Sequence, residues 1–272
     1  MCSASAPKKS RANASPNCWN GFVPKRLRPR RGANEQLADL AGRRTRLRLS
    51  ARPPGPLRLR ASVGGDDAAA LLATDRTGFR RSGDYVYKPY CPSCQACIPT
   101  RLPVASFKPD RKQKRCRKRN ADTRSVIRPA EFDPRHFDLY RRYLAARHDD
   151  PDKEPVSAED YLNFLGSRWC DTRFVEFLIG GRLAAVAVVD IVDDGLSAVY
   201  TFFDPEFAEF SPGVYAVLWQ IETAAQWGLP YLYLGFWIED CRKMRYKIEY
   251  QPLLGLVGDR WQPLSNHTFN EE

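Results

Sequence analysis

Three cysteines stand three residues apart in the stretch CPSCQACIP, at Cys91, Cys94 and Cys97. Thiolates with such spacing bind zinc or iron–sulfur clusters. However, a closed zinc site needs four ligands, and the run C-x2-C-x2-C-x3-C needs a fourth cysteine. The next cysteine, Cys116, follows only within a cationic stretch. We therefore expect reduced thiols that support a tight turn, and a metal bound by the three cysteines or a redox sensor remain the alternatives.

Two neighbouring arginines and a third one nearby are candidates for binding an anion. Arg80 and Arg81 stand between two glycines in GFRRSG, and Arg101 ends the stretch CIPTR. A guanidinium presents a planar fork of N–H donors that matches a carboxylate or a phosphate. The alternative for each arginine is a structural carboxylate partner or a solvated position.

A dense cationic cluster follows the cysteines. The stretch from Lys108 to Arg119 holds eight Lys and Arg residues and one Asp. Such a cluster suits the phosphate backbone of a nucleic acid, which it would bind in a salt-sensitive manner without reading the bases. The alternative is a solvated linker. The candidate contacts are Lys112, Lys114, Arg115, Arg117, Lys118 and Arg119.

The segment EDCRKMRYKIEY carries a second set of polar groups directly after an apolar stretch. If it is helical, Lys243 and Lys247 share one face, with Tyr246 one residue away. Glu239 and Asp240 follow the end of the apolar stretch, where a carboxylate can accept a proton. The alternative is an exposed basic face with ordinary loop acids.

The three histidines do not indicate a catalytic or metal site. His136, His148 and His267 have neither metal-ligand nor triad spacing. His136 falls in a predicted helix, where we expect a surface or packing role. Without a Ser–His or Cys–His arrangement, nucleophilic catalysis is weakly supported.

These residues must be positioned by an α+β fold. Strands are expected at 84–88 and 100–107, and a short helix at 66–74. Between 133 and 238 the order is helix, helix, strand, strand, strand, helix, strand. The signals are Asp133 with Pro134, Ser157 with Asp160, and Ser211 with Pro212 as helix starts, and the turns at Gly180-Gly181 and Asp194-Gly195. We expect a mixed sheet.

The composition is typical of a globular protein, and the excess of positive charge lies near the N-terminus. The 272 residues are 43% hydrophobic, and the net charge is +11. Residues 1–60 hold 15 basic and 2 acidic residues, whereas the remainder holds 28 and 30. We expect a disordered basic arm or an atypical start there; an RNA-binding tail is the alternative. No secretory signal or membrane-length apolar run occurs, and we expect the eight cysteines to be reduced, which favours the cytoplasm.

The order of elements resembles the GNAT acyltransferase fold, whose strand–helix–strand unit forms the acyl-donor wedge. GNAT enzymes that use acetyl-CoA usually hold its pyrophosphate with a glycine-rich loop before that helix. Here the loop AEFSPGVY contains one glycine, Gly213, and Pro212, which lacks an N–H donor. A CoA-dependent N-acyltransferase is therefore an alternative, as is a non-catalytic RNA-binding protein.

Longer motifs resemble the aminoacyl-tRNA–protein transferases of the N-end rule. GFRRSGDYVYKPYC, CIPTR and RKRN resemble their N-terminal signature, and YLYLGFWIEDCRKMRYKIEYQP with GDRW resembles their C-terminal signature, so about residues 75–262 are covered. The resemblance implies peptide-bond formation between an aminoacyl-tRNA and the N-terminus of a protein, which marks that protein for degradation. The short chain with its cysteines is most similar to bacterial leucyltransferases that act on N-terminal Asp or Glu; transfer of arginine from Arg-tRNA to the same acceptors is the alternative.

This resemblance implies roles and partners for the candidate residues. An aminoacyl ester is already activated, so the reaction needs no ATP, metal or other cofactor. It needs a positioned amine, a proton acceptor and a cation for the acceptor carboxylate. The expected partners are aminoacyl-tRNA and proteins with N-terminal Asp or Glu, and neither DNA nor a membrane. We expect catalysis by Tyr246 and Asp240, substrate binding by Arg80, Arg81, Arg101, Trp237, Lys243 and Lys247, and tRNA binding by the six cations of the 108–119 cluster.

The expected domain organisation has four parts. Residues 1–60 form the basic arm, and residues 61–130 form a small N-terminal domain with the cysteines and the cationic cluster. Residues 131–265 form a GNAT-like catalytic domain with a mixed sheet, and residues 266–272 form a tail.

Overall fold

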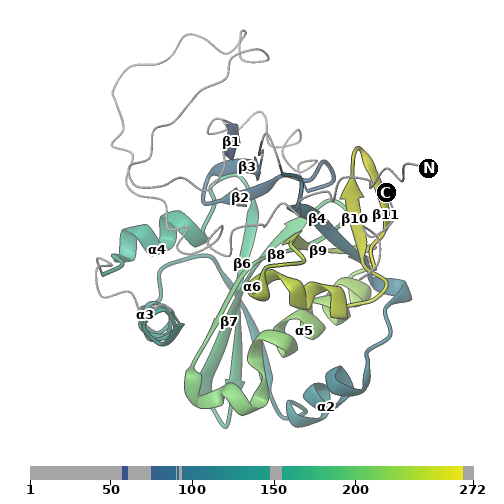
Figure 1. Cartoon of the computed structure of the whole chain (residues 1–272). Helices are drawn as coiled ribbons and strands as arrows, with labels where there is room; N and C mark the ends of the chain where they lie inside the picture. Colours follow the sequence, from purple (N-terminus) through teal and green to yellow (C-terminus); the bar gives the residue numbers. More distant parts are fainter. Residues whose placement is uncertain (1–56, 61–74, 90, 92–93, 148–154, 266–272) are drawn as a thin grey trace, which may run out of the picture.

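The computed structural model describes residues 57–60, 75–89, 91, 94–147 and 155–265. An eight-stranded sheet forms its centre, in the order β11-β10-β4-β9-β8-β7-β6-β5 (Figure 1). Its neighbours are antiparallel except β8 and β9, which are parallel. The strands are β4 Ile98–Pro103, β5 Arg124–Pro129, β6 Asp171–Ile179, β7 Arg182–Val192, β8 Gly195–Phe203, β9 Tyr231–Trp237, β10 Leu254–Val257 and β11 Arg260–Pro263.

A second, three-stranded sheet lies beside the central one. It has the order β1-β3-β2 and is antiparallel. Its strands are β1 Leu57–Arg60, β2 Arg80–Ser82 and β3 Tyr85–Pro89. Gly83 turns β2 into β3 with a φ of 60°, and a Cβ there would lie 1.9 Å from the carbonyl oxygen of Asn163. Glycine therefore lets this hairpin approach the main body closely.

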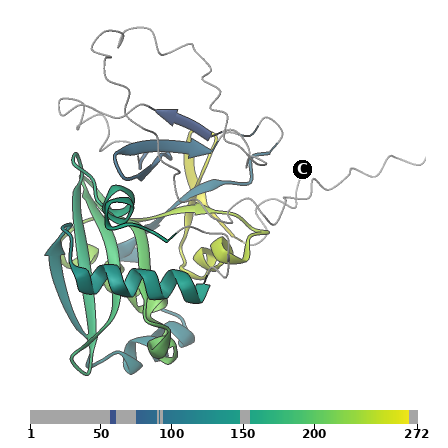
Figure 2. The ribbon, with the colours of Figure 1, turned by 90° about the vertical axis from the view of Figure 1, so that its left-hand side faces the viewer.

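Helices cover both faces of the central sheet. They are α2 Arg111–Arg119, α3 Pro134–Arg147, α4 Ala158–Leu165, α5 Pro212–Gln226 and α6 Arg242–Arg245, with 3-10 turns η2 Val104–Ser106, η3 Pro205–Phe210 and η4 Tyr246–Glu249. One core lies between the sheet and α5, against which α2 packs. The other lies between the sheet and α3 with α4, and Figure 2 shows α3 crossing in front of the strands. Because β7 is covered on both faces, its residues 183–189 form a continuous apolar run.

The two parallel strands separate after a short pairing. β8 pairs with β9 only from Gly195 to Ser197, opposite Tyr231 to Tyr233. Beyond these residues β8 stays with β7 as far as Phe203, and β9 stays with β4 as far as Trp237. The sheet therefore opens between β8 and β9, and α5 connects these two strands.

The α+β fold with a mixed sheet is confirmed, as is the order of elements from 133 to 238. Ser157 caps α4 by accepting a hydrogen bond from the Asp160 amide at 3.1 Å. In contrast, Ser211 precedes α5 with a φ of 53° and makes no side-chain cap. The strand expected at 100–107 starts at Ile98 and ends at Pro103.

Several elements differ from the sequence expectation or lie outside the described residues. The cationic cluster is helix α2 rather than a linker, and β5, β10 and β11 were not expected. β4 and β5 come from the segment assigned to the N-terminal domain, yet both are strands of the central sheet; the domain boundaries stay a prediction. The helix expected at 66–74 and most of the arm at 1–60 lie outside the described residues.

No helix in the described part of the chain combines the length and the apolar composition needed to cross a bilayer.

Candidate functional site

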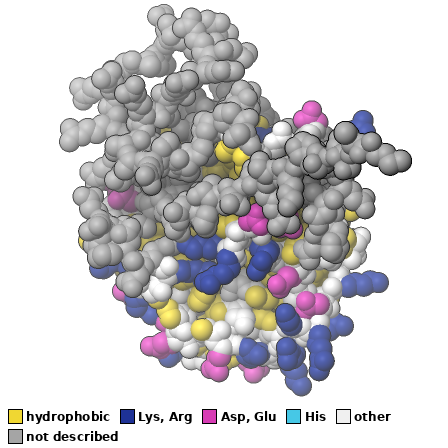
Figure 3. All heavy atoms as spheres, in the orientation of Figure 1, with side chains coloured by type: hydrophobic (Ala, Val, Ile, Leu, Met, Phe, Trp, Pro, Cys, Tyr) yellow, Lys and Arg dark blue, Asp and Glu magenta, His cyan; other side chains and the backbone are white. Residues whose placement is uncertain are grey.

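A cavity of about 590 Å³ lies where β8 and β9 separate. Its walls come from β2, the C-terminal half of α3, the diverging strands, the N-terminus of α5, and the α6–η4 segment. The opening of the sheet thus creates a site that residues distant in the sequence line together. Figure 3 shows Lys and Arg side chains gathered on the face viewed in Figure 1, with hydrophobic side chains between them.

Arg80 lies at the point of divergence. Its Nη1 donates to Asp75 Oδ1 at 2.8 Å and to Ser197 Oγ at 2.7 Å, and its Nη2 donates to the carbonyl oxygen of Ala198. The side chain is 10% exposed. Burial raises the pKa of Asp75, and the charge of Arg80 partly offsets this. Arg80 therefore lines the cavity while holding the β2–β3 hairpin on β8.

Arg81 also lines the cavity, but internal acceptors occupy its guanidinium. Its Nη2 donates to Asp190 Oδ1 at 2.6 Å and to the Leu165 carbonyl at 3.0 Å, and its Nη1 donates to the Gly166 carbonyl at 3.1 Å. The side chain is 5% exposed. It joins β2 to the end of α4 and to β7, which matches the structural alternative considered from the sequence.

Arg101 and Trp237 are not among the described residues that line the cavity. The Arg101 guanidinium lies 3.9 Å from the ring centre of Tyr231 and 4.3 Å from that of Trp261, a cation–π arrangement. The indole of Trp237 is buried and donates to the Arg245 carbonyl at 3.3 Å. Their role in substrate binding stays a prediction.

Lys243, Tyr246 and Lys247 all line the cavity. Lys247 is 6% exposed, and its Nζ donates to the Phe236 carbonyl and lies 3.3 Å from Met244 Sδ. Burial lowers the pKa of Lys247 to about 7, and the nearby charge of Arg80 acts in the same direction. Lys243 is exposed and Tyr246 is 43% exposed. The two lysines therefore differ in environment although both face the same cavity.

The two carboxylates expected as proton acceptors lie apart from these groups. Glu239 and Asp240 are exposed in the turn between β9 and α6. Neither is among the described residues that line the cavity. Their role in proton transfer stays a prediction.

Gln220 also lines the cavity, although no sequence motif marks it. It is 1% exposed on α5, and its Nε2 donates to the Ala216 carbonyl at 3.0 Å. Because this bond fixes the amide, Oε1 is the free end, and it has no hydrogen-bond partner among the described residues. Such an acceptor is well placed to receive an N–H from a ligand.

Helix α2 presents cations away from the core. Gln113 donates to the Glu249 carbonyl at 3.1 Å and Asn120 to the Phe210 carbonyl at 2.8 Å, which fixes the helix beside the cavity wall. Arg117 pairs with Glu222, and Arg119 donates to the Glu209 carbonyl. The four remaining candidates are exposed: Lys112, Lys114, Arg115 and Lys118.

The cysteines near the β4 strand are not joined by disulfides. Cys91 and Cys94 pair in an isolated β-bridge. Cys116 is buried on α2, where its thiol contacts the Phe210 carbonyl at 3.7 Å. Among the described residues, Cys91, Cys94 and Cys97 are not a group of potential metal ligands within 4.8 Å of one another.

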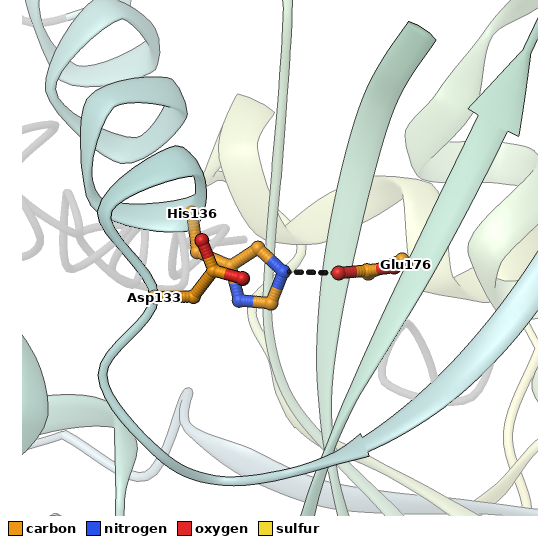
Figure 4. A group of neighbouring side chains, drawn as sticks. All are labelled: Asp133, His136 and Glu176. Carbon is orange, nitrogen blue, oxygen red and sulfur yellow. Dashed lines mark hydrogen bonds and ion pairs between the residues drawn. The ribbon is translucent and has the colours of Figure 1, made fainter. Parts of the chain in front are cut away.

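A separate buried cluster surrounds His136 (Figure 4). His136 Nε2 lies 2.9 Å from Glu176 Oε1, and Asp133 is within 4.8 Å of both potential ligand atoms. Arg135 Nη2 donates to the same Glu176 oxygen at 2.9 Å and to Asp133 at 2.6 Å. Because Arg135 pairs with both carboxylates and Arg128 also pairs with Glu176, internal cations already serve this cluster, which fastens α3 to β6. Of the surface or packing role expected for His136, its burial agrees with packing.

Comparison with known proteins identifies the family. Residues 60–115 match the family described as arginine-tRNA-protein transferase, N terminus, and residues 135–257 match its C terminus. The aspartate/glutamate leucyltransferase of Thiobacillus denitrificans is 51% identical over 198 residues, which are 73% of this chain and 82% of that protein. The proteins of the same name from Alcanivorax borkumensis and Pseudomonas fluorescens are 52% and 49% identical; each match covers 69% of this chain, and 78% and 80% of those proteins. The chain belongs to the arginine-tRNA-protein transferase family.

Proposed function

We propose that this protein transfers leucine from Leu-tRNA to the N-terminal Asp or Glu of acceptor proteins and thereby marks them for degradation. The α-amine of the acceptor attacks the ester carbonyl, an amide bond forms, the ester bond breaks, and the tRNA hydroxyl leaves with a proton. The observation that carries this proposal is the cavity between β8 and β9, which combines an apolar wall with several basic side chains. The names of the relatives point to the same reaction.

The apolar wall supports leucine over arginine as the transferred residue. Val199, Phe203, Val214, Val217 and Leu234 line the cavity. These side chains suit a branched aliphatic group. An arginyl group would need a carboxylate beside it, and among the described lining residues the one acid is Glu249, which is exposed.

The reacting groups fall among the polar side chains of the cavity. We assign Tyr246 to the aminoacyl ester and Gln220 Oε1 to an N–H of a substrate amine. Lys247 exchanges a proton near neutral pH, because burial lowers its pKa to about 7, so it joins Asp240 as a candidate proton acceptor. Arg80 supplies positive charge near the carbonyl that is attacked.

The tRNA contacts are assigned to α2. Lys112, Lys114, Arg115 and Lys118 are exposed on one helix whose other residues hold it beside the cavity wall. Phosphate contacts of this kind position the substrate without reading sequence. The aminoacyl end would enter the cavity while the acceptor stem lies along α2.

One transfer assay tests the function. The protein is incubated with radiolabelled Leu-tRNA or Arg-tRNA and with peptides that begin with Asp, Glu, Lys or Ala. We expect label only from Leu-tRNA and only in the Asp and Glu peptides. Transfer of arginine instead of leucine would overturn the donor assignment, and transfer to Lys peptides would overturn the acceptor assignment. Labelling by acetyl-CoA in a parallel reaction would favour a CoA-dependent enzyme.

A further inference from the structure

The basic side chains of the cavity differ in how many of their donors are already used. Five of them line it: Arg80, Arg81, Arg147, Lys243 and Lys247. A substrate that is selected for an acidic side chain needs a cation whose donors can turn to that carboxylate. The described contacts of these five residues therefore indicate which one can bind it.

Two arginines are occupied by the protein itself. Arg80 donates to Asp75, Ser197 and Ala198, and its charge is paired with the Asp75 carboxylate. Arg81 is paired with Asp190 and also donates to backbone carbonyls of the α4 end. A second carboxylate at either arginine would have to compete with a buried internal one, which is unfavourable.

The lysines are less suitable for a carboxylate. Lys247 is buried, donates to the Phe236 carbonyl, and has its pKa lowered to about 7 by burial. It therefore carries only part of a charge at neutral pH. Lys243 is exposed on α6 and offers a compact ammonium rather than a planar fork.

Arg147 differs from the two other arginines because no described internal acceptor occupies its guanidinium, and from the lysines because it offers a planar fork of donors. It is the last residue of α3, it is exposed, and its guanidinium carbon lies 5.5 Å from the ring centre of Tyr143. To the described residues its guanidinium makes no hydrogen bond and no ion pair. Tyr143, Tyr200 and Tyr246 line the same cavity as Arg147, and the ring centres of Tyr143 and Tyr200 lie 6.3 Å apart. Arg147 therefore shares the cavity wall with tyrosines from α3, β8 and η4.

We propose that Arg147 binds the side-chain carboxylate of the acceptor's N-terminal Asp or Glu and so sets the acceptor specificity. The inference rests on the proposed function. A two-pronged guanidinium contact discriminates a carboxylate from the isosteric amide of Asn or Gln, because the amide lacks the charge and one acceptor oxygen. The long, exposed arginine side chain can serve both Asp and Glu, which differ by one methylene. The neighbouring tyrosines add hydroxyl donors to this contact.

The test compares Arg147→Ala with Arg141→Ala. Arg141 is an exposed arginine on the same helix that is not among the described lining residues. The full chain is assayed for kcat/KM with peptides that begin with Asp, Glu, Asn or Gln, and for Leu-tRNA affinity by filter binding. We expect Arg147→Ala to lower kcat/KM for the Asp and Glu peptides by roughly 10- to 100-fold and to change Asn and Gln peptides little. In Arg147→Ala the ratio of kcat/KM for the Asp peptide to that for the Asn peptide should fall, and the affinity for Leu-tRNA should not change. Arg141→Ala should give the same values as the natural chain.

A charge reversal and a binding measurement complete the test. Arg147→Glu should reverse the order of Asp and Lys peptides in affinity, as measured by calorimetry on the full chain with unreactive peptides. An unchanged Asp-to-Asn ratio in Arg147→Ala would overturn the assignment while leaving the transfer reaction intact. A loss confined to Leu-tRNA affinity would also overturn it and place Arg147 on the nucleic acid. If the natural chain transfers no leucine, the proposed function fails, and the calorimetry still decides whether Arg147 selects acidic N-termini.

Discussion

The guanidinium of Arg80 lies 2.7 Å from the hydroxyl of Ser197, which is the last β8 residue paired with β9. A side chain from the N-terminal hairpin thus occupies the point at which the sheet opens. Gly235, opposite on β9, has a φ of 77°, and a Cβ there would lie 3.4 Å from Arg80 Nε. The cavity therefore depends on a close three-way contact of β2, β8 and β9.

Removal of Arg80 should destabilise the protein as well as the cavity. Arg80→Ala leaves Asp75 buried without its partner, so we expect the free energy of unfolding to fall by about 3 kcal/mol. Ser197→Ala removes one hydrogen bond and should cost about 1 kcal/mol. Urea unfolding measures both. The double variant Arg80→Ala/Asp75→Asn should recover part of the loss, and failure to recover would mean that Asp75 is not the source of the penalty.

Loss of the Arg81 ion pair should lower the free energy of unfolding much more than loss of the Arg168 ion pair. Arg81 and Asp190 are buried, whereas the Arg168 side chain that pairs with Asp84 is 86% exposed. Arg81→Ala should cost about 3–5 kcal/mol, and Arg168→Ala about 0–1 kcal/mol. Thermal and urea unfolding of the two variants provide the comparison. Equal losses would contradict the structural role assigned to Arg81.

Lys247 should make stability rise with pH above neutrality. Its pKa is about 7 in the folded chain and 10.5 in the unfolded chain. Below pH 7 both states are charged and the burial penalty is fully present. Between pH 7 and 10.5 only the unfolded state keeps the proton, so the folded state gains up to about 1.4 kcal/mol per pH unit.

The control for this pH dependence is Lys247→Met, which has a similar length and no charge. The free energy of unfolding is measured for both proteins by urea titration from pH 6 to pH 9. The difference between them should shift in favour of the natural chain as the pH rises above 7. Parallel curves would show that Lys247 keeps an ordinary pKa.

Gln220 should affect transfer much more than stability. Gln220→Leu removes the Oε1 acceptor, which has no described protein partner, and one local bond to Ala216. We expect the free energy of unfolding to change by less than about 1 kcal/mol and the leucyl transfer rate to fall at least about tenfold. Gln220→Glu keeps an acceptor oxygen and should retain more activity. A fully active Gln220→Leu protein would remove Gln220 from the reaction.

Neutralising the outer face of α2 should weaken tRNA binding alone. In Lys112→Gln/Lys114→Gln, the slope of log affinity against log salt concentration should fall by about 1 for each phosphate that the variant no longer binds. The KM for the acceptor peptide should not change. The control is Arg124→Gln/Arg141→Gln, which removes two exposed cations elsewhere. An equal effect in both pairs would indicate a general charge effect instead of an α2 contact.

The sequence predicted the elements best where local chemistry marks their ends. Pro134 and Ser157 start helices where expected, and Gly180-Gly181 turns β6 into β7. No helix was expected over α2, because its charge density indicated a phosphate-binding cluster or, as the alternative, a solvated linker. Its signal was present in Asp110 and Gln113, which form a capping box with bonds of 2.7 and 2.9 Å.

The roles of individual site residues were harder to predict because they depend on distant partners. Arg80 and Arg81 are neighbours in sequence, but a strand points successive side chains in opposite directions. Arg80 therefore contacts Asp75 and Ser197, whereas Arg81 contacts Asp190. Helical spacing also failed to separate exposed Lys243 from buried Lys247, because the α-helix ends at Arg245 and tightens into η4. Gln220 could not be predicted because it lies on an amphipathic helix, and the amphipathic pattern does not indicate where a cavity lies.

The position of β4 has a consequence for synthesis on the ribosome. β4 ends at Pro103, yet its partners β9 and β10 begin at Tyr231 and Leu254. During translation this strand has neither neighbour until most of the chain has emerged, so the central sheet closes only late. Nascent chains arrested before Leu254 should therefore be open to proteases and dependent on chaperones, whereas released full-length chains should not.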